Sequence, residues 1–261
     1  MSPLQTLGSV WLLAAVVMTC GWLWQRRHAN AGIVDVLWAA GLAGSAVLCA
    51  ALAPGATAPR LLVALGGGLW GARLAWHLWR RVRGAAEDGR YAHLRRSWHS
   101  GPWKWFALFQ FQAALVALFS IPFVIAAANP AIRPPWPALA VLIWCVSLAG
   151  ETRADRQLAA FRADPDNRGR TCRSGLWRYS RHPNYFFEWL HWFSYAALAV
   201  GARHGWWALL GPAVMWLFLR FLSGIPFTEA QALRTRGADY RDYQRSTSML
   251  IPWPPRRRAA Q

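Results

Sequence analysis

Residues 105–128 read WFALFQFQAALVALFSIPFVIAAA, a run without a charged side chain. A helix needs about 20 apolar residues to cross the hydrocarbon core of a bilayer. Six further apolar stretches occur, at about 5–24, 33–53, 61–79, 136–150, 185–200 and 206–227. Only 15% of the 261 residues are charged, against about 25% in soluble domains. The sequence therefore predicts an all-α integral membrane protein with about seven transmembrane helices.

The net charge of +18 is distributed along the chain in a way that fits a membrane topology. Arg and Lys number 24 in four alternate segments (25–32, 80–104, 151–184 and the chain after residue 227) and only 3 in the loops between them. Basic loops stay in the cytoplasm. This predicts an outside N-terminus and a cytoplasmic C-terminus, and it explains the charge without a nucleic-acid partner. The terminal Arg256–Arg258 is predicted to anchor the tail to anionic lipid.

The chain is predicted to be a single domain over residues 1–261, because no internal repeat divides it. The long, polar loops are the predicted cytoplasmic ones, so we expect function on that side. The four cysteines form no CxxC pair, and neither a disulfide framework nor a metal site is expected. Gly66, Gly68 and Gly71 match a dinucleotide fingerprint, but they lie in an apolar span without a preceding strand. Small residues at that spacing favour helix packing.

The run Ser180-Arg-His-Pro-Asn-Tyr185, followed by Glu188, is the clearest candidate for a site. Pro is tolerated in the first turn of a helix, so Pro183 marks a helix start with free backbone N–H groups beside Asn184. Such a start favours a phosphate or carboxamide. An ionisable side chain inside a span, as at Glu188, suggests function. A capped helix with a structural ion pair is the simpler alternative.

Three further constellations have both a functional and a structural interpretation. Glu151, Asp155 and Arg162 share one helical face and suit an amide, ribose or cation, or form a solvated helix end. Arg73 and His77 lie one turn apart near the level of Asp35; His77 is a candidate proton donor, or the group is a structural pair with a packing histidine. Glu229, followed by Tyr240 to Tyr243, Arg245 and Ile251-Pro-Trp253, forms a group that mixes aromatics with arginine, which suits a planar base with phosphates or an interfacial belt.

Several segments in order resemble one superfamily: Arg73-Leu-Ala-Trp-His77, Glu87-Asp-Gly-Arg-Tyr91, Gly150-Glu-Thr-Arg-Ala-Asp155, Gly175 to Tyr185, and Tyr240-Arg-Asp-Tyr243 with Ile251-Pro-Trp253. The chain resembles the steroid 5α-reductase-like membrane reductases, in particular their bacterial branch. The likeness implies a seven-helix fold in the bacterial inner membrane, with an NADPH cavity facing the cytoplasm. Residues 1–128 would then admit a hydrophobic substrate from the bilayer, and residues 129–261 would bind the cofactor.

The resemblance implies NADPH-dependent reduction of a conjugated C=C bond in a steroid-, isoprenoid- or lipid-like enone. The predicted cofactor site comprises Glu151, Asp155, Arg162, Arg181, His182, Asn184, Tyr185, Glu188, Trp192, Tyr240 and Tyr243. The predicted catalytic group is His77, oriented by Arg73 and Asp35. The steroid enzymes instead pair a Glu in an early span with a Tyr in the third span; His77 falls where that Tyr would be.

Two alternatives remain open at the level of the sequence. The His182-Pro183-x-Tyr185 run also resembles isoprenylcysteine carboxyl methyltransferases, which use S-adenosylmethionine on a lipid or isoprenoid substrate. A non-enzymatic membrane lipid-binding protein is the other. Charge favours NADPH, because its phosphates call for cations and six arginines precede the motif: Arg162, Arg168, Arg170, Arg173, Arg178 and Arg181.

Overall fold

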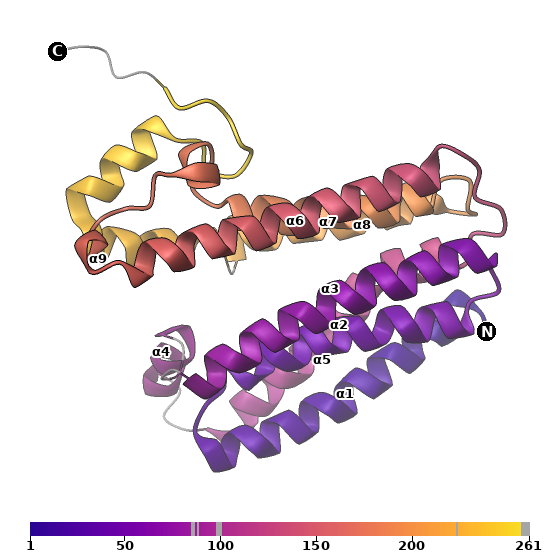
Figure 1. Cartoon of the computed structure of the whole chain (residues 1–261). Helices are drawn as coiled ribbons and strands as arrows, with labels where there is room; N and C mark the ends of the chain where they lie inside the picture. Colours follow the sequence, from indigo (N-terminus) through magenta and orange to yellow (C-terminus); the bar gives the residue numbers. More distant parts are fainter. Residues whose placement is uncertain (85–86, 88, 98–100, 223, 257–261) are drawn as a thin grey trace. The chain divides into compact units, whose positions relative to one another are not determined.

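The computed structural model describes residues 1–84, 87, 89–97, 101–222 and 224–256. Over these residues the chain is helical and has no strand, which confirms the predicted all-α class (Figure 1). Asp88 of the Glu87–Tyr91 segment, and Arg257 and Arg258 of the basic tail, lie outside the described residues.

Within the described part of the chain, five stretches are long and apolar enough to cross a membrane. They are α1 (Pro3–His28), α2 (Ile33–Leu52), α5 (Pro102–Ala127), α6 (Trp136–Ala163) and the run Gly205–Ser246. This length and apolarity are those of a membrane protein. The other two predicted spans are helical but differ: α7 (Pro183–Leu198) has only 16 residues, and α3 (Thr57–Gly84) ends in an arginine-rich turn. The seven-span count and the orientation stay predictions.

The last stretch is a chain of short helices. It contains η3 (Gly205–Leu209), α8 (Leu210–Leu217), the π-helical turn η4 (Phe218–Leu222) and α9 (Ile225–Ser246). Gly237 interrupts α9 with φ 51° and ψ −116°, a conformation open to glycine because it has no Cβ. The kink lets the two halves of α9 run in different directions.

The chain forms two compact units. Unit 1 comprises Met1–Ala140 and Tyr195–Gly211; unit 2 comprises Val141–Ser194 and Pro212–Gln261. The boundary at residue 141 lies inside α6, twelve residues beyond the division expected at 128/129. Both α6 and α7 contribute to both units.

Close helix packing forms the core of unit 1, where α2 packs against α1, α3 and α5. A Cβ on Gly71 of α3 would lie 2.9 Å from the Ala39 carbonyl oxygen, and one on Gly67 would lie 2.5 Å from the Ala46 Cβ. Small residues therefore let the backbones of α2 and α3 approach each other. The packing interpretation of Gly71 is confirmed; Gly67, which lies outside the fingerprint pattern, shares that role.

Candidate functional site

The loop between α6 and α7 folds back onto α6 in unit 2. It contains two 3₁₀ turns, η1 (Pro165–Asn167) and η2 (Gly175–Arg178). Trp177 donates from Nε1 to the Ala154 carbonyl at 2.9 Å, and Gln157 Oε1 accepts from the Leu176 N–H at 2.9 Å. The loop is thus fixed to the helix, and α7 then begins at Pro183 as the sequence predicts.

Asp155 and Asn184 join α6 to the first turn of α7. Asn184 Nδ2 donates to Asp155 Oδ1 at 3.2 Å, and both side chains are half-buried. A carboxylate and a carboxamide side by side offer acceptors and donors to a ligand amide or hydroxyl. The structure therefore brings together two predicted cofactor residues that are 29 positions apart in the sequence.

The contact between α6 and α7 also determines where the predicted acids Glu151 and Glu188 lie along the two helices. A Cβ on Gly150 would lie 2.4 Å from the Phe187 ring, so the helices are in close contact there. Together with the Asp155–Asn184 bond, this contact gives an antiparallel register that puts Glu151 of α6 and Glu188 of α7 at one level. Glu151 is buried and Glu188 half-buried. The predicted acids of the two helices therefore lie at matching levels along α6 and α7.

The buried aromatic Trp192 lies two turns farther along α7 from Asn184 and is fully buried. Its position continues the Asn184 and Glu188 face of α7, because residues four apart share a side of a helix. The predicted contact between Trp192 and a cofactor stays a prediction.

Glu229 of α9 is the centre of a polar cluster. The sequence did not predict that these residues contact one another. Glu229 Oε1 accepts from Arg181 Nε at 2.7 Å and lies 3.2 Å from His182 Nε2. Its Oε2 accepts from Gln244 Nε2 at 2.8 Å, and the Tyr240 hydroxyl donates to Oε1 at 3.4 Å. Glu229 therefore holds the loop before α7 against both halves of α9.

Arg181 also donates hydrogen bonds to the backbone of the last turn of α9 and of the residues that follow it. Its Nη1 donates to the Gln244 carbonyl at 2.8 Å and the Thr247 carbonyl at 3.0 Å. Its own N–H donates to the Ser248 carbonyl at 2.8 Å. These contacts make Arg181 a link between two segments of unit 2.

The His182 ring is almost fully buried and stacks on the Tyr185 ring, with centroids 5.4 Å apart and planes 6° apart. Burial lowers the pKa of His182 below its usual value, and this outweighs the opposing effect of the Glu229 carboxylate. Loss of hydration disfavours the charged imidazolium. His182 is therefore neutral near pH 7 and acts as a packed, hydrogen-bonded ring.

Tyr240 and Tyr243 are buried beside this cluster, at 3% and 2% exposed. The Tyr243 hydroxyl donates to the carbonyls of Trp177 and Ser180, the latter at 3.1 Å. Tyr185 has its hydroxyl 3.3 Å from Thr228 Oγ1. The cofactor contact predicted for these phenols stays a prediction. In the structure their hydroxyl groups contact the loop before α7 and residues of α9.

The arginines before the motif fall into two groups. Arg173 pairs with Asp242 at 2.8 Å and Asp239 at 2.7 Å, and Arg181 pairs with Glu229. The other four are exposed: Arg162, Arg168, Arg170 and Arg178. Arg168, Arg170 and Arg178 are thus exposed in the loop, and Arg162 is exposed at the end of α6.

The predicted catalytic trio lies in unit 1. Asp35 accepts from Arg90 Nη2 at 2.9 Å and from the Tyr91 hydroxyl at 2.7 Å, so α4 (Gly89–Ser97) supplies two partners that the sequence analysis did not assign to it. His77 is exposed on α3, and Arg73 lies one turn before it. Orientation of His77 by Arg73 and Asp35 stays a prediction.

Comparison with known proteins gives one match. The profile of a family described as a protein of unknown function (DUF1295) covers residues 21–247. The chain belongs to the DUF1295 family. No curated protein matches it, and no solved structure does. The predicted catalytic trio and the loop–α9 cluster (Arg181, His182, Glu229, Tyr240 and Gln244) lie within the matched range.

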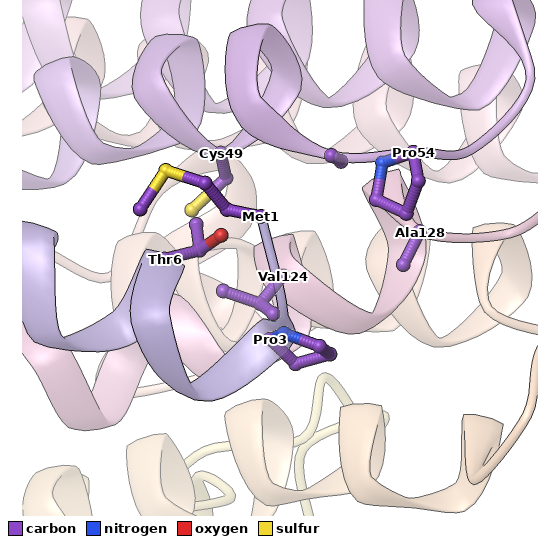
Figure 2. A pocket seen from close by; sticks show the side chains of 8 residues that line it. Met1, Pro3, Thr6, Cys49, Pro54, Val124 and Ala128 are labelled. Atoms are coloured by element: carbon purple, nitrogen blue, oxygen red, sulfur yellow. The ribbon is translucent and has the colours of Figure 1, made fainter.

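A small pocket in unit 1 is a poor alternative site for this DUF1295 protein. It is lined by Met1, Pro3, Thr6, Cys49, Ala53, Pro54, Val124 and Ala128. Figure 2 shows the Met1 side chain lying alongside Cys49 and Thr6. Apart from one hydroxyl and one thiol, these side chains are apolar, and they offer no converging charges for a ligand.

Sequence reasoning grouped Glu229 with Tyr240 to Tyr243, but it predicted neither the central role of Glu229 nor its contact with Gln244. One signal was available, because Glu229 is an isolated acid in a strongly basic C-terminal region. Its partners Arg181 and His182 lie 48 and 47 positions away, respectively. In an uninterrupted helix the 15 positions between Glu229 and Gln244 would separate them by about 22 Å, so their contact depends on the kink at Gly237.

Proposed function

We propose that the protein binds NADPH in unit 2 and reduces a conjugated C=C bond in a hydrophobic enone. The observation that carries the proposal is the Asp155–Asn184 pair, which joins α6 and α7 directly after an arginine-rich loop. Membrane-spanning helices support a substrate that partitions into the bilayer. The resemblance of the ordered motifs to the steroid 5α-reductase-like enzymes supports the reaction class.

The side chains of unit 2 fit the chemistry of this cofactor. Asn184 and Asp155 would hold the nicotinamide carboxamide or its ribose, because they offer both donors and acceptors. The exposed Arg162, Arg168, Arg170 and Arg178 would neutralise the phosphates, since guanidinium groups suit phosphate oxygens. When bound, NADPH supplies a hydride, so that with one proton the C=C bond becomes a single bond and NADP⁺ is left.

The buried cluster would serve this site by positioning it. Arg181, His182 and Glu229 fix the end of the loop, so that Asn184 starts α7 at a defined place. Such support limits the freedom of groups that contact a ligand. His77 stays the proposed proton donor. A variant at this position tests that role separately from cofactor binding.

The methyltransferase alternative rests on the His182-Pro183 run. S-adenosylmethionine carries a sulfonium, and four exposed arginines in one segment favour an anionic ligand over a cationic one. The His182 side chain is buried against Glu229 and Tyr185, which supports a structural role. These features favour the reductase.

The test is the identity of the nucleotide that comes with the purified protein. Mass spectrometry of material released from detergent-solubilised protein is expected to find NADPH or NADP⁺. S-adenosylmethionine, or its demethylated product, would overturn the reductase proposal. If neither class is found and neither raises the melting temperature, a lipid-binding protein is the better description.

Variants then test the residues. Asn184→Ala is expected to weaken NADPH binding about tenfold, as for loss of one charge-assisted or amide contact of about 1.4 kcal/mol. Asn167→Ala is the matched control, because Asn167 lies in the preceding loop and bonds to the Phe161 carbonyl. Equal affinity in wild type and Asn184→Ala would remove Asn184 from the cofactor site. His77→Phe should spare NADPH binding and abolish turnover.

A further inference from the structure

The ends of several helices in unit 1 gather tryptophans and arginines in one place. α1 and α3 finish there, α2 and α5 begin there, and α4 lies beside them (Figure 1). Exposed cations at this end include Arg26, Arg27, Arg80, Arg83 and Lys104. At the other end of unit 1 the basic side chains are Arg60, Arg133 and Arg203.

Two cation–π pairs and one stacked Trp–His pair occur at the basic end. Arg26 lies over the Trp22 ring at 5.1 Å and Arg83 over the Trp79 ring at 5.6 Å. Trp24 stacks on His28 with centroids 4.1 Å apart. In each pair the second residue follows its tryptophan by four positions, so both side chains share a helix face. The set Trp22, Trp24, Arg26, His28, Trp79 and Arg83 is called the Trp–Arg belt below.

The Trp–Arg belt bridges two helices. Trp24 of α1 lies 6.4 Å from Trp79 of α3, measured between ring centroids. Trp22 donates from Nε1 to the Pro102 carbonyl at 3.2 Å, which ties it to the start of α5. The rings are therefore held in place by the fold, and a guanidinium packed over such a ring is attracted electrostatically to its face.

The two described acids at this end, Asp35 and Glu87, are already engaged. Asp35 binds Arg90 and Tyr91. Glu87 binds Arg95 at 2.7 Å and also accepts from the Ala31 N–H at 2.7 Å. Over the described residues, Arg26 and Arg83 have no ion pair or hydrogen bond to a protein acceptor. The belt thus presents two oriented guanidinium groups whose charge the described acids do not neutralise.

We propose that the Trp–Arg belt is a binding site for the headgroup of an anionic phospholipid. Tryptophan settles at the boundary between headgroups and acyl chains, where the fixed arginines meet lipid phosphates. Each Arg near an anionic membrane surface contributes about 1 kcal/mol to attraction, and an additional headgroup charge distinguishes anionic from zwitterionic lipid. This site is independent of the proposed NADPH site, because its residues belong to unit 1.

Native mass spectrometry of the detergent-solubilised full chain tests the proposal with phosphatidylglycerol and phosphatidylcholine as probes. The wild type is expected to retain phosphatidylglycerol in preference. The double variant Arg26→Gln, Arg83→Gln should lose roughly 30-fold in phosphatidylglycerol affinity if the two contributions add. The double variant Arg133→Gln, Arg203→Gln makes the same charge change at the other end and should keep the preference.

Several outcomes would overturn the proposed lipid site. Equal losses in the two double variants, or no loss in either, would overturn the proposal. Full displacement of the lipid by an equal concentration of inorganic phosphate would also overturn it, by assigning the site to a free anion. If the Arg26, Arg83 variant does not fold, the proposal is tested on the wild type by adding salt, which must reduce its preference for phosphatidylglycerol. A preference that is insensitive to salt contradicts the proposal.

Discussion

The Glu229 carboxylate of α9 accepts a 2.7 Å hydrogen bond from Arg181, the residue two places before α7 begins. Their side chains are only 15% and 11% exposed. The same oxygen lies 3.2 Å from His182, so one carboxylate fixes two consecutive residues of the loop. The motif that the sequence singles out is thus held by an acid in another helix.

Glu229→Gln should destabilise the protein by about 3 kcal/mol, because it leaves the largely buried Arg181 guanidinium without its counter-charge. Thermal unfolding in detergent, followed by tryptophan fluorescence, measures the loss. Asp166→Asn removes one negative charge from an exposed position in the same unit and should change the midpoint little. An equal midpoint for Glu229→Gln and wild type would show that the cluster contributes no stability.

The helical class could be predicted from the sequence because bilayer-spanning helices need long apolar runs, and these are visible directly. Each predicted apolar segment falls in a helical region, although α3 begins four residues earlier than expected and α6 extends through Ala163. The longer α6 reflects its polar end, where Glu151 and Asp155 continue the helix beyond the apolar run. Apolarity alone cannot mark that end.

The candidate site was predictable in its local part only. Asn184 at a helix start and Asp155 on the preceding helix were found by spacing, and the structure brings them into contact. Hydrogen bonds between distant segments were not predictable, since pairing of Glu229 with Arg181 depends on how α9 folds back. Likewise, the partners of Asp35 come from α4, whose short polar sequence gave no span signal.

Tyr243→Phe distinguishes a structural phenol from a cofactor contact. Its hydroxyl donates to the carbonyls of Trp177 and Ser180, so its removal should cost about 1–2 kcal/mol by leaving buried acceptors unsatisfied. NADPH affinity should change less than twofold (on the order of 0.4 kcal/mol) if the contact is only structural. Thermal unfolding and a nucleotide titration on the same preparation separate the two roles.

Tyr179→Phe is the control for that variant. Tyr179 is exposed, and among the described residues its hydroxyl has no hydrogen bond. Its removal should leave both readouts unchanged. A large fall in NADPH affinity for Tyr243→Phe at unchanged stability would instead support the cofactor contact predicted from the resemblance.

Gly237→Ala should destabilise the kinked helix α9. Gly237 has φ 51° and ψ −116°, and strain of this kind costs a side chain about 1–3 kcal/mol. No atom lies within 4 Å of a Cβ built there, so the loss would come from backbone strain and not from a clash. Gly8→Ala, in helix α1 and also without a near neighbour, should be neutral or stabilising. Equal behaviour of the two variants in thermal unfolding would contradict the kink.

Stability should fall as pH drops below about 6.5, in part because of His182. Burial lowers the pKa of this ring in the folded state, whereas in the unfolded chain it titrates near 6.5. Below that pH the unfolded state binds the extra proton, so the stabilisation present above pH 6.5 is lost as pH falls, by at most about 1.4 kcal/mol per pH unit. Arg181 disfavours the proton and Glu229 favours it, but burial dominates.

The comparison that isolates His182 is the pH dependence of unfolding between pH 7.5 and 5, a window chosen to bracket the usual histidine pKa of about 6.5. His182→Gln keeps a hydrogen-bonding side chain beside Glu229 but cannot titrate, so its unfolding midpoint should fall less steeply than that of wild type. His93→Gln removes an exposed histidine of α4 and should leave the wild-type slope intact. A slope for His182→Gln as steep as wild type would mean that the ring is protonated equally in the folded and unfolded chains. That result would contradict the neutral, packed imidazole on which the loop–α9 cluster depends.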